Sequence, residues 1–266
     1  MTNAQLTTLA RGKGDTVVVL IHPASGSLTG LRRFAAQWPT GQTILGIEAT
    51  GPGAPGGCSV EQIADHYLDL LPATLDQSAV IFGGWSLGGA VAVEMCRRHL
   101  ARGGRVPAIW LFDSASPDVL ASFEYDVSDI LRLLFDLNAQ AGPRGRAWQI
   151  TEELLSEAAT VLSTEFHAMF GDVAPDDLRS HFNTYIWHVA SACAPWAPTG
   201  PALDVEAVLV RARDEGRWAQ CSEDLGWAPS FSRPVSVVWV PGSHNSLFDA
   251  PRVPGVIKAI SAATTS

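Results

Sequence analysis

Short apolar runs bounded by turn residues recur along the chain, at residues 17–21, 44–47, 79–82, 108–112, 207–210 and 235–240. Within each run the apolar residues are consecutive rather than alternating, which is typical of a strand buried on both faces. The segments between the early runs have helical periodicity instead. The pattern therefore predicts an α/β protein with a mostly parallel sheet covered by helices.

The clearest helix begins after Ser59. Apolar residues follow it on one helical stripe, at positions 60, 63, 64, 67, 68 and 71. Ser59 and Gln62, three residues apart, form the sequence signature of a capping box at a helix N-terminus. We therefore expect a crossover helix that connects two parallel strands.

The rhythm changes between residues 114 and 201, where no convincing strand occurs and helical patterns are found at 129–137, 151–170 and 175–194. A connection of this length inside a compact domain needs structure and a purpose of its own. We expect a helical lid at residues 114–201, inserted into a core formed by residues 16–113 and 202–266. Residues 1–15 are predicted to be a linker or flexible N-terminus.

Composition and charge exclude several classes of function. The chain has 27 acidic and 18 basic residues, a net charge of −9, and no basic run that could neutralise nucleic-acid phosphates. Neither a secretory signal nor a membrane span is evident. The four cysteines are scattered without a C-x-x-C pair, which is typical of a reducing compartment. We expect a soluble cytoplasmic protein that binds neither nucleic acid nor membrane.

The chemistry of the chain centres on the stretch Gly84-Trp85-Ser86-Leu87-Gly88, which matches G-x-S-x-G. It lies between the apolar run 79–82 and a helical run from residue 87 to about 102. A serine at such a junction occupies a strained turn above the sheet, where its hydroxyl can act as a nucleophile. The following helix N-terminus makes the Leu87 amide a natural oxyanion donor. The alternative is a Gly-rich turn whose serine only caps the helix.

A nucleophilic serine needs a base, and of the seven histidines His244 fits this role. It ends the stretch Pro241-Gly242-Ser243-His244 after the last apolar run, C-terminal to the serine, which suits the chain order Ser, acid, His. The alternative is a histidine in an ordinary surface loop.

Two aspartates are candidates for the acid that orients the histidine. Asp113 follows the apolar run 108–112, and Asp214 follows the next run, 207–210. Both would lie at the carboxyl ends of neighbouring strands, where sites of open parallel sheets form. Asp113 is favoured because the chain enters the insertion directly after it, whereas Asp214 belongs to a charged segment typical of a solvated loop.

A second oxyanion donor is expected in the stretch His22-Pro23-Ala24-Ser25-Gly26, after the first buried strand. Folds of this kind draw that donor from a loop amide at this position, and small residues let the amide approach the substrate. Ala24 is the candidate donor. His22 is interpreted as a structural hydrogen-bonding residue.

These residues together resemble the thioesterase domains that end nonribosomal peptide and polyketide synthetases, within the α/β-hydrolase superfamily. The resemblance covers nearly the whole length and rests on HPASG at 22–26, GWSLGG at 84–89, LFDS at 111–114, Trp227 and GSH at 242–244. Ser25 stands where the family usually has Gly. The resemblance implies the α/β-hydrolase fold, a mostly parallel sheet flanked by helices, with a helical lid insertion.

The resemblance also implies a mechanism. Ser86, activated by His244 and Asp113, would take an acyl chain from the phosphopantetheine arm of a carrier protein, with the amides of Leu87 and Ala24 holding the oxyanion. Water or a nucleophile within the chain would then release the product, with no bound cofactor and no metal. The partners would be a peptidyl or acyl carrier domain and a small-molecule acyl substrate. Residues of the lid expected to line the substrate cavity are Phe135, Phe166, Phe170, Tyr185, Trp187 and His188.

Other functions stay open at this level. A discrete type II editing thioesterase or a small-ester serine hydrolase would use the same triad. A binding protein with a hydrolase fold and no chemistry is the third alternative, and the joint presence of Ser86, Asp113 and His244 argues against it. The acyl chain, and its release by hydrolysis, cyclisation or with epimerisation, are not encoded in any motif.

Overall fold

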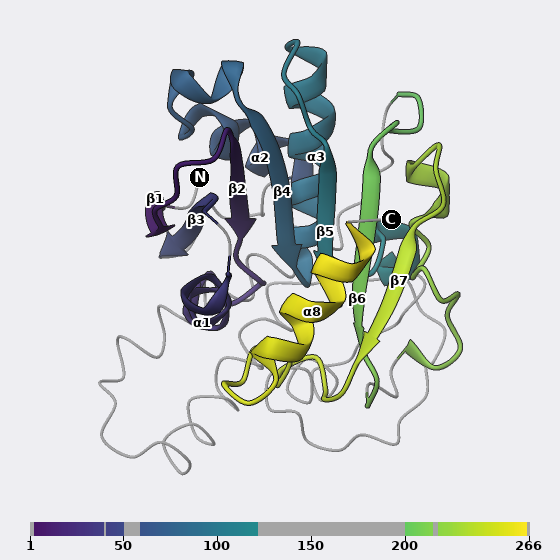
Figure 1. Ribbon diagram of the computed structural model, residues 1–266. Helices are drawn as coiled ribbons and strands as arrows, with labels where there is room; N and C mark the ends of the chain where they lie inside the picture. Colours follow the sequence, from purple (N-terminus) through teal and green to yellow (C-terminus); the bar gives the residue numbers. More distant parts are fainter. Residues whose placement is uncertain (1–2, 40, 51–58, 122–199, 215–217, 265–266) are drawn as a thin grey trace, which may run out of the picture.

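A sheet of seven strands forms the centre of the described chain, in the order β1-β3-β2-β4-β5-β6-β7 (Figure 1). The computed structural model describes residues 3–39, 41–50, 59–121, 200–214 and 218–264. The strands are β1 Asn3–Ala10, β2 Thr16–Ile21, β3 Thr43–Thr50, β4 Ala79–Trp85, β5 Ala108–Phe112, β6 Glu206–Ala212 and β7 Ser236–Val240. All neighbouring pairs are parallel except β1 with β3.

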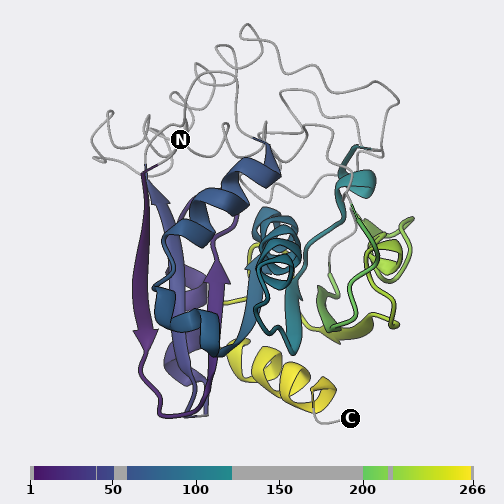
Figure 2. The same ribbon diagram turned by 90° about the horizontal axis from the view of Figure 1, so that it is seen from above.

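Helices cover both faces of the sheet (Figures 1 and 2). Helices α2 (Val60–Asp69) and α3 (Leu87–Ala101) pack on one face, where their buried residues join one hydrophobic cluster with side chains of the strands. Helices α1 (Thr29–Gln37) and α8 (Val253–Ala263) pack on the other face, around a second cluster. The remaining helices are short: α4 Pro117–Ala121 and the 3₁₀ turns η1 Ala73–Gln77 and η3 Ala228–Ser230.

The predicted mostly parallel sheet, covered by helices on both faces, is confirmed. Every residue of β5, and all but the outermost residue of β2, β4 and β6, is buried, as consecutive apolar positions predict for strands covered on both faces. Strand β7 at the edge of the sheet is more exposed, and its Trp239 keeps 38% of its surface accessible. The sheet therefore presents the carboxyl ends of six parallel strands at one edge, where sites form in folds of this kind.

The prediction that residues 1–15 form a linker or flexible N-terminus is wrong for the described part. Strand β1 pairs with β3 in antiparallel register from Asn3 with Thr50 to Thr8 with Leu45. Leu6 and Leu9 pack against the hydrophobic clusters on opposite faces of the sheet. The apolar signal is weak because polar residues flank these two leucines, and an edge strand of this kind needs only a partner strand and partial burial.

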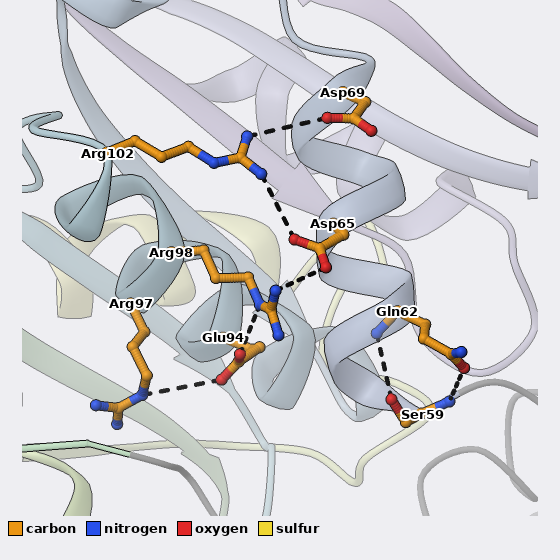
Figure 3. A network of polar contacts seen from close by, with 8 residues as sticks. All are labelled: Ser59, Gln62, Asp65, Asp69, Glu94, Arg97, Arg98 and Arg102. Atoms are coloured by element: carbon orange, nitrogen blue, oxygen red, sulfur yellow. Dashed lines mark hydrogen bonds and ion pairs between the residues drawn. The ribbon is translucent and has the colours of Figure 1, made fainter.

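Helix α2 begins with the capping box that the sequence predicts (Figure 3). The Gln62 amide donates to Ser59 Oγ at 3.3 Å, and the Ser59 amide donates to Gln62 Oε1 at 3.0 Å. Five of the six stripe residues are buried, and Leu71 lies beyond the helix end. The pattern of apolar positions therefore identified both the start of the helix and its buried face.

Ion pairs join α2 to the middle and the C-terminal part of α3 (Figure 3). Arg98 bridges Asp65 of α2 at 2.6 Å and Glu94 of its own helix at 2.7 Å. Burial raises the pKa of the Glu94 carboxyl, which the pairing with Arg98 counteracts. The exposed members of such a network add little stability each, but a buried carboxylate without its arginine would be costly. The network fixes α3, the helix that begins at the predicted nucleophile.

The predicted lid lies almost wholly outside the described residues. Only its two ends are described, residues 114–121 and 200–201. The returning end is held by α3, because Arg97 Nη1 donates to the Pro201 carbonyl at 2.7 Å. The helical patterns at 129–137, 151–170 and 175–194 and the six candidate substrate residues of the lid also lie outside the described residues, so these predictions are not tested.

Candidate active site

Ser86 lies in the turn that joins β4 to α3, with φ 56° and ψ −124°. A non-glycine residue rarely adopts a positive φ, and the surrounding structure must hold it there. A Cβ atom at Gly84 would clash with the Gly88 carbonyl, and one at Gly88 would lie 2.5 Å from the His22 carbonyl. The two glycines of the motif are therefore required by the close approach of strand, helix and loop.

His244 and Asp113 are brought together at the same edge of the sheet. His244 Nδ1 lies 2.7 Å from Asp113 Oδ2, and both residues are buried. Because a carboxylate only accepts hydrogen bonds, Nδ1 donates to Asp113, and in the neutral ring Nε2 then carries the lone pair that a general base needs. Asp113 Oδ1 accepts a second hydrogen bond from the Ala212 amide at 3.0 Å. The carboxylate is thus oriented from two sides.

Asp214, the other candidate acid, does not take this place. It is exposed, and its Oδ2 accepts a hydrogen bond from the Gly242 amide at 3.1 Å. Its own amide donates to the Gly242 carbonyl at 3.0 Å. Asp214 therefore holds the backbone of the turn that leads to His244, whereas Asp113 contacts the imidazole itself.

The histidine ring also contacts the turn that contains Ser86. Trp85, the residue before Ser86, packs its ring against His244 with centroids 5.9 Å apart and against Phe248 at 5.2 Å. This contact was not predicted from the sequence, although an aromatic residue beside the serine of the motif is visible there. Strands β4 and β5 and the turn after β7 thus bring Ser86, Asp113 and His244 to one edge of the sheet.

The loop after β2 is held by a buried histidine. His22 Nδ1 lies 2.6 Å from the Pro23 carbonyl, and His22 Nε2 lies 2.5 Å from the Tyr67 hydroxyl. Burial lowers the pKa of His22 to about 4, although the hydrogen bond to the Pro23 carbonyl raises this pKa in part. The ring is therefore neutral near pH 7. The Gly26 amide also donates to the Pro23 carbonyl, at 2.9 Å. This supports the interpretation of His22 as a structural residue; its partner, the hydroxyl of Tyr67, was missed because Tyr67 fits the apolar stripe of α2.

These contacts orient the peptide group that precedes Ala24. In a planar trans peptide the carbonyl and the N–H point in opposite directions, so anchoring the Pro23 carbonyl directs the Ala24 N–H away from His22. The Leu87 amide belongs to the first turn of α3, where N–H groups have no partner within the helix. Ala24 and Leu87 come from adjacent segments, because Gly88 packs against the His22 carbonyl.

A pocket of about 270 Å³ opens beside these residues. Trp85 and Asn245, the chain neighbours of Ser86 and His244, line it together with Ser25, Ser27, Thr29 and Phe248. Among the described residues, no group of three or more His, Cys, Asp or Glu side chains could hold a metal ion. None of the described helices is long and apolar enough to cross a membrane.

Comparison with known proteins identifies the family. The family model of the thioesterase domain matches residues 16–264, nearly the whole chain. The chain belongs to the thioesterase domain family. This family consists of hydrolytic enzymes, which agrees with the strained turn at Ser86 and the His–Asp pair described above.

Three similar proteins are a protein named as a thioesterase, a large synthase and a solved thioesterase domain. The chain is 28% identical over 161 residues to "Thioesterase frbE" of Dothideomycetidae sp. (strain 11243), covering 51% of this chain and 62% of that protein. It is 25% identical over 276 residues to an orsellinic acid synthase of Beauveria bassiana, covering 93% of this chain but 12% of the synthase. The Vlm2 thioesterase domain, solved with a bound dodecadepsipeptide, is 20% identical with a TM-score of 0.70, covering 97% of both chains. The chain therefore spans less than two thirds of the first two relatives, and the last likeness concerns the fold.

Proposed function

We propose that this thioesterase releases a peptidyl or polyketide acyl chain from the phosphopantetheine arm of a carrier protein, through an acyl-enzyme on Ser86. The observation that carries the proposal is the buried 2.7 Å contact between His244 Nδ1 and Asp113 Oδ2 beside the strained turn at Ser86. Such an arrangement of serine, histidine and aspartate activates a hydroxyl for acyl transfer.

The reaction proceeds in two steps. His244 Nε2 accepts the proton of Ser86 as Oγ attacks the thioester carbonyl carbon, and the carrier thiolate leaves with that proton. Water, or a hydroxyl or amine of the acyl chain, then attacks the ester carbon while His244 takes its proton. The bond between that carbon and Ser86 Oγ breaks, and His244 returns the proton to Oγ. In each step Asp113 stabilises the imidazolium and keeps it in the correct orientation.

Backbone amides stabilise the oxyanion that forms in both steps. The Leu87 amide at the start of α3 and the Ala24 amide after the anchored Pro23 carbonyl are the proposed donors. Losing one such donor typically costs roughly a hundred- to a thousand-fold in rate. The pocket lined by Trp85 and Asn245 lies next to His244. His244 exchanges protons with both the leaving thiol and the second nucleophile. We therefore propose that the thiol leaves and the second nucleophile enters through this pocket.

The similar proteins support a carrier-bound substrate. The matched part of the Beauveria bassiana protein is 12% of a synthase, a context in which acyl chains are tethered to carrier domains. We therefore propose a peptidyl or acyl carrier domain as the partner. The thioester substrate supplies its own electrophile, so the mechanism uses no bound cofactor.

The insertion is proposed to enclose the acyl chain. A peptidyl or polyketide chain is far larger than the atoms that the triad contacts, and an acyl-enzyme open to water would hydrolyse before a slower intramolecular attack. Residues 114–201 are not needed to build the sheet. The lid side chains proposed to contact the chain are Phe135, Phe166, Phe170, Tyr185, Trp187 and His188.

A discrete editing thioesterase is the second candidate, favoured by one observation. The frbE protein is itself named a thioesterase, and the aligned region covers 62% of it, so related chains also occur apart from large synthases. An editing enzyme would prefer a carrier loaded with a short acyl group over one loaded with the full product chain.

A panel of three substrates tests the proposal. Carrier protein loaded with a peptidyl or polyketide thioester, carrier loaded with acetyl, and a short p-nitrophenyl ester are compared, with intact mass of the released product as the readout. We expect the long carrier-bound chain to give the highest kcat/KM. Preference for acetyl-carrier would assign editing instead, and activity on the p-nitrophenyl ester alone would assign a small-ester hydrolase.

Ser86→Ala is the matched variant. It should lower kcat on every substrate by on the order of 10⁶-fold and abolish labelling by a fluorophosphonate probe. Ser230→Ala, which removes another buried serine hydroxyl, should leave both unchanged. Labelling that persists in Ser86→Ala, or turnover that does not depend on Ser86, would contradict the mechanism.

A further inference from the structure

The segment that follows the proposed acid rests on the connection between β6 and β7. Trp227 Nε1 donates to the Ser114 carbonyl at 2.7 Å, and the Ser116 amide donates to the Leu225 carbonyl at 2.9 Å. Trp227 and Ser114 are both fully buried. Two hydrogen bonds from a connection more than a hundred residues away therefore hold the backbone immediately after Asp113.

This backbone needs such support because of its conformation. Asp113 has φ 44°, in the left-handed region, directly after strand β5. A residue in this region persists only where its surroundings over-determine it. Ser114 is also the point at which the acid segment meets the nucleophile helix, since a Cβ atom at Gly89 would clash with the Ser114 side chain. A shift of the Ser114 peptide would move Asp113 relative to both His244 and α3.

The indole that anchors Ser114 is itself fixed. The Trp227 amide donates to the Asp224 carbonyl at 3.1 Å, and Asp224 Oδ2 accepts from the Ala228 amide at 2.6 Å. Just before Asp224 in the chain, the carbonyls of Ser222 and Glu223 accept hydrogen bonds from the Arg211 guanidinium, at 3.3 Å and 3.1 Å. The connection is thus held as one unit against β6, the strand whose Ala212 amide contacts Asp113.

We propose that Trp227 is a positioning residue for the reaction, whose indole N–H holds the Ser114 carbonyl and through it keeps the Asp113 carboxylate at His244. The inference rests on the proposed function, in which Asp113 orients His244. Trp227 touches neither substrate nor the reacting atoms. Its effect passes through the peptide group between Ser114 and Ala115, whose carbonyl it holds, and from there through the backbone of Ser114 to Asp113.

Trp227→Phe removes the donor and keeps an aromatic ring. A misplacement of about 1 Å in a catalytic group typically costs up to a hundredfold in rate, so we expect kcat on an acyl thioester to fall by roughly 10- to 100-fold with KM unchanged. Trp110→Phe is the matched control. Trp110 is buried in β5, three residues before Asp113, and its indole nitrogen has no hydrogen-bond partner among the described residues, so its kcat should stay within a few-fold of the parent protein.

A double-mutant cycle with Asp113→Asn separates positioning from general loss of structure. If Trp227 acts through Asp113, the double variant should be no slower than Asp113→Asn alone. Losses that multiply would overturn the inference, because Trp227 would then act by another route. The acidic limb of the pH dependence of kcat/KM should also move to lower pH in Trp227→Phe, since a displaced carboxylate stabilises the imidazolium less.

A second variant covers the case in which Trp227→Phe does not fold. Replacing Trp227 by β-(3-benzothienyl)alanine exchanges the N–H for sulfur in a ring of nearly the same shape, and the same fall in kcat is expected. A parent-like kcat in this folded variant would overturn the inference. If Asp113→Asn itself has no effect on kcat, the role of Asp113 in the proposed function is wrong. If Asp113→Asn is slow and both Trp227 variants turn over as fast as the parent protein, only the inference about Trp227 is wrong.

Discussion

Two aspartates follow neighbouring parallel strands of this thioesterase and do different things. Asp113 comes directly after β5, is 1% exposed, and divides its oxygens between His244 and the Ala212 amide. Asp214 comes two residues after β6, is exposed, and accepts from the Gly242 amide. One carboxylate therefore contacts the imidazole, and the other contacts the backbone that carries the imidazole.

The difference arises from the turn rather than from the strand. Asp113 leaves β5 in a left-handed conformation, and the next residues are covered by Trp227 and Leu225. Asp214 continues from β6 toward solvent beside Gly242, which has φ 113°. Several residues therefore lie at the carboxyl ends of parallel strands. The one that contacts the histidine is the one that a neighbouring connection buries.

Asp113→Asn should have the largest effect in this comparison. The uncharged amide stabilises an imidazolium less than a carboxylate does, and its NH2 group can donate to Nδ1 and so favour the wrong tautomer of His244; we therefore expect kcat to fall by on the order of 10⁴-fold. The measurement is steady-state turnover of an acyl thioester at pH 7 to 8. Fluorophosphonate labelling of Ser86 should slow in parallel. A loss below about tenfold would show that Asp113 does not orient the base.

The buried His22, whose carbonyl lies against Gly88, gives the second prediction. The pKa of His22 is lowered to about 4 by burial, from 6.5 in the unfolded chain. Between these values the unfolded chain binds more protons, so the free energy of unfolding should fall as pH drops from about 6.5 to 4. The full loss, reached below pH 4, is about 3 kcal/mol, equivalent to roughly a few hundredfold in the folding equilibrium.

Urea unfolding at steps between pH 7 and pH 4 measures this loss. His22→Gln removes the titrating group, so its unfolding free energy should depend less on pH across the same window. The opposite sign, with stability rising as pH falls from 6.5, would contradict the burial of a neutral His22.

Much of the sheet could be predicted because its strands are buried on both faces. Residues 79–82 and 108–112, for example, are consecutive apolar residues, which is the pattern of a strand buried on both faces. The capping box at Ser59 and Gln62 likewise depends on local chemistry alone. Strand β1 was missed because its stability comes from pairing with β3, and its few apolar residues give no run. Local signals predict local structure, whereas pairing at an edge depends on the partner strand.

The candidate site divides in the same way. The turn at Ser86 is visible in five consecutive residues, and the place of His244 follows from chain order. The sequence favours Asp113 over Asp214 without deciding between them, because the left-handed turn at Asp113 and the indole of Trp227 that supports it are tertiary features. Hydrogen bonds from the tips of buried aromatic residues, such as Tyr67 and Trp227, have no signature in periodicity.

Asp214→Asn should have the smallest effect on kcat, and it tests most directly whether Asp113 and Asp214 have different roles. The asparagine side-chain oxygen can still accept the hydrogen bond from the Gly242 amide, which Asp214 Oδ2 now accepts at 3.1 Å, so the turn before His244 should keep its shape. We expect kcat to change by less than about threefold, within the range of an exposed hydrogen bond of roughly 0.5 kcal/mol.

Asp214→Ala removes the acceptor and should lower kcat more than Asp214→Asn does, yet far less than Asp113→Asn does. Turnover of one acyl thioester by the three variants, measured side by side, decides the order. If Asp214→Asn proved as slow as Asp113→Asn, the charge after β6 would itself be needed for turnover, and the division of roles between the two aspartates would be wrong.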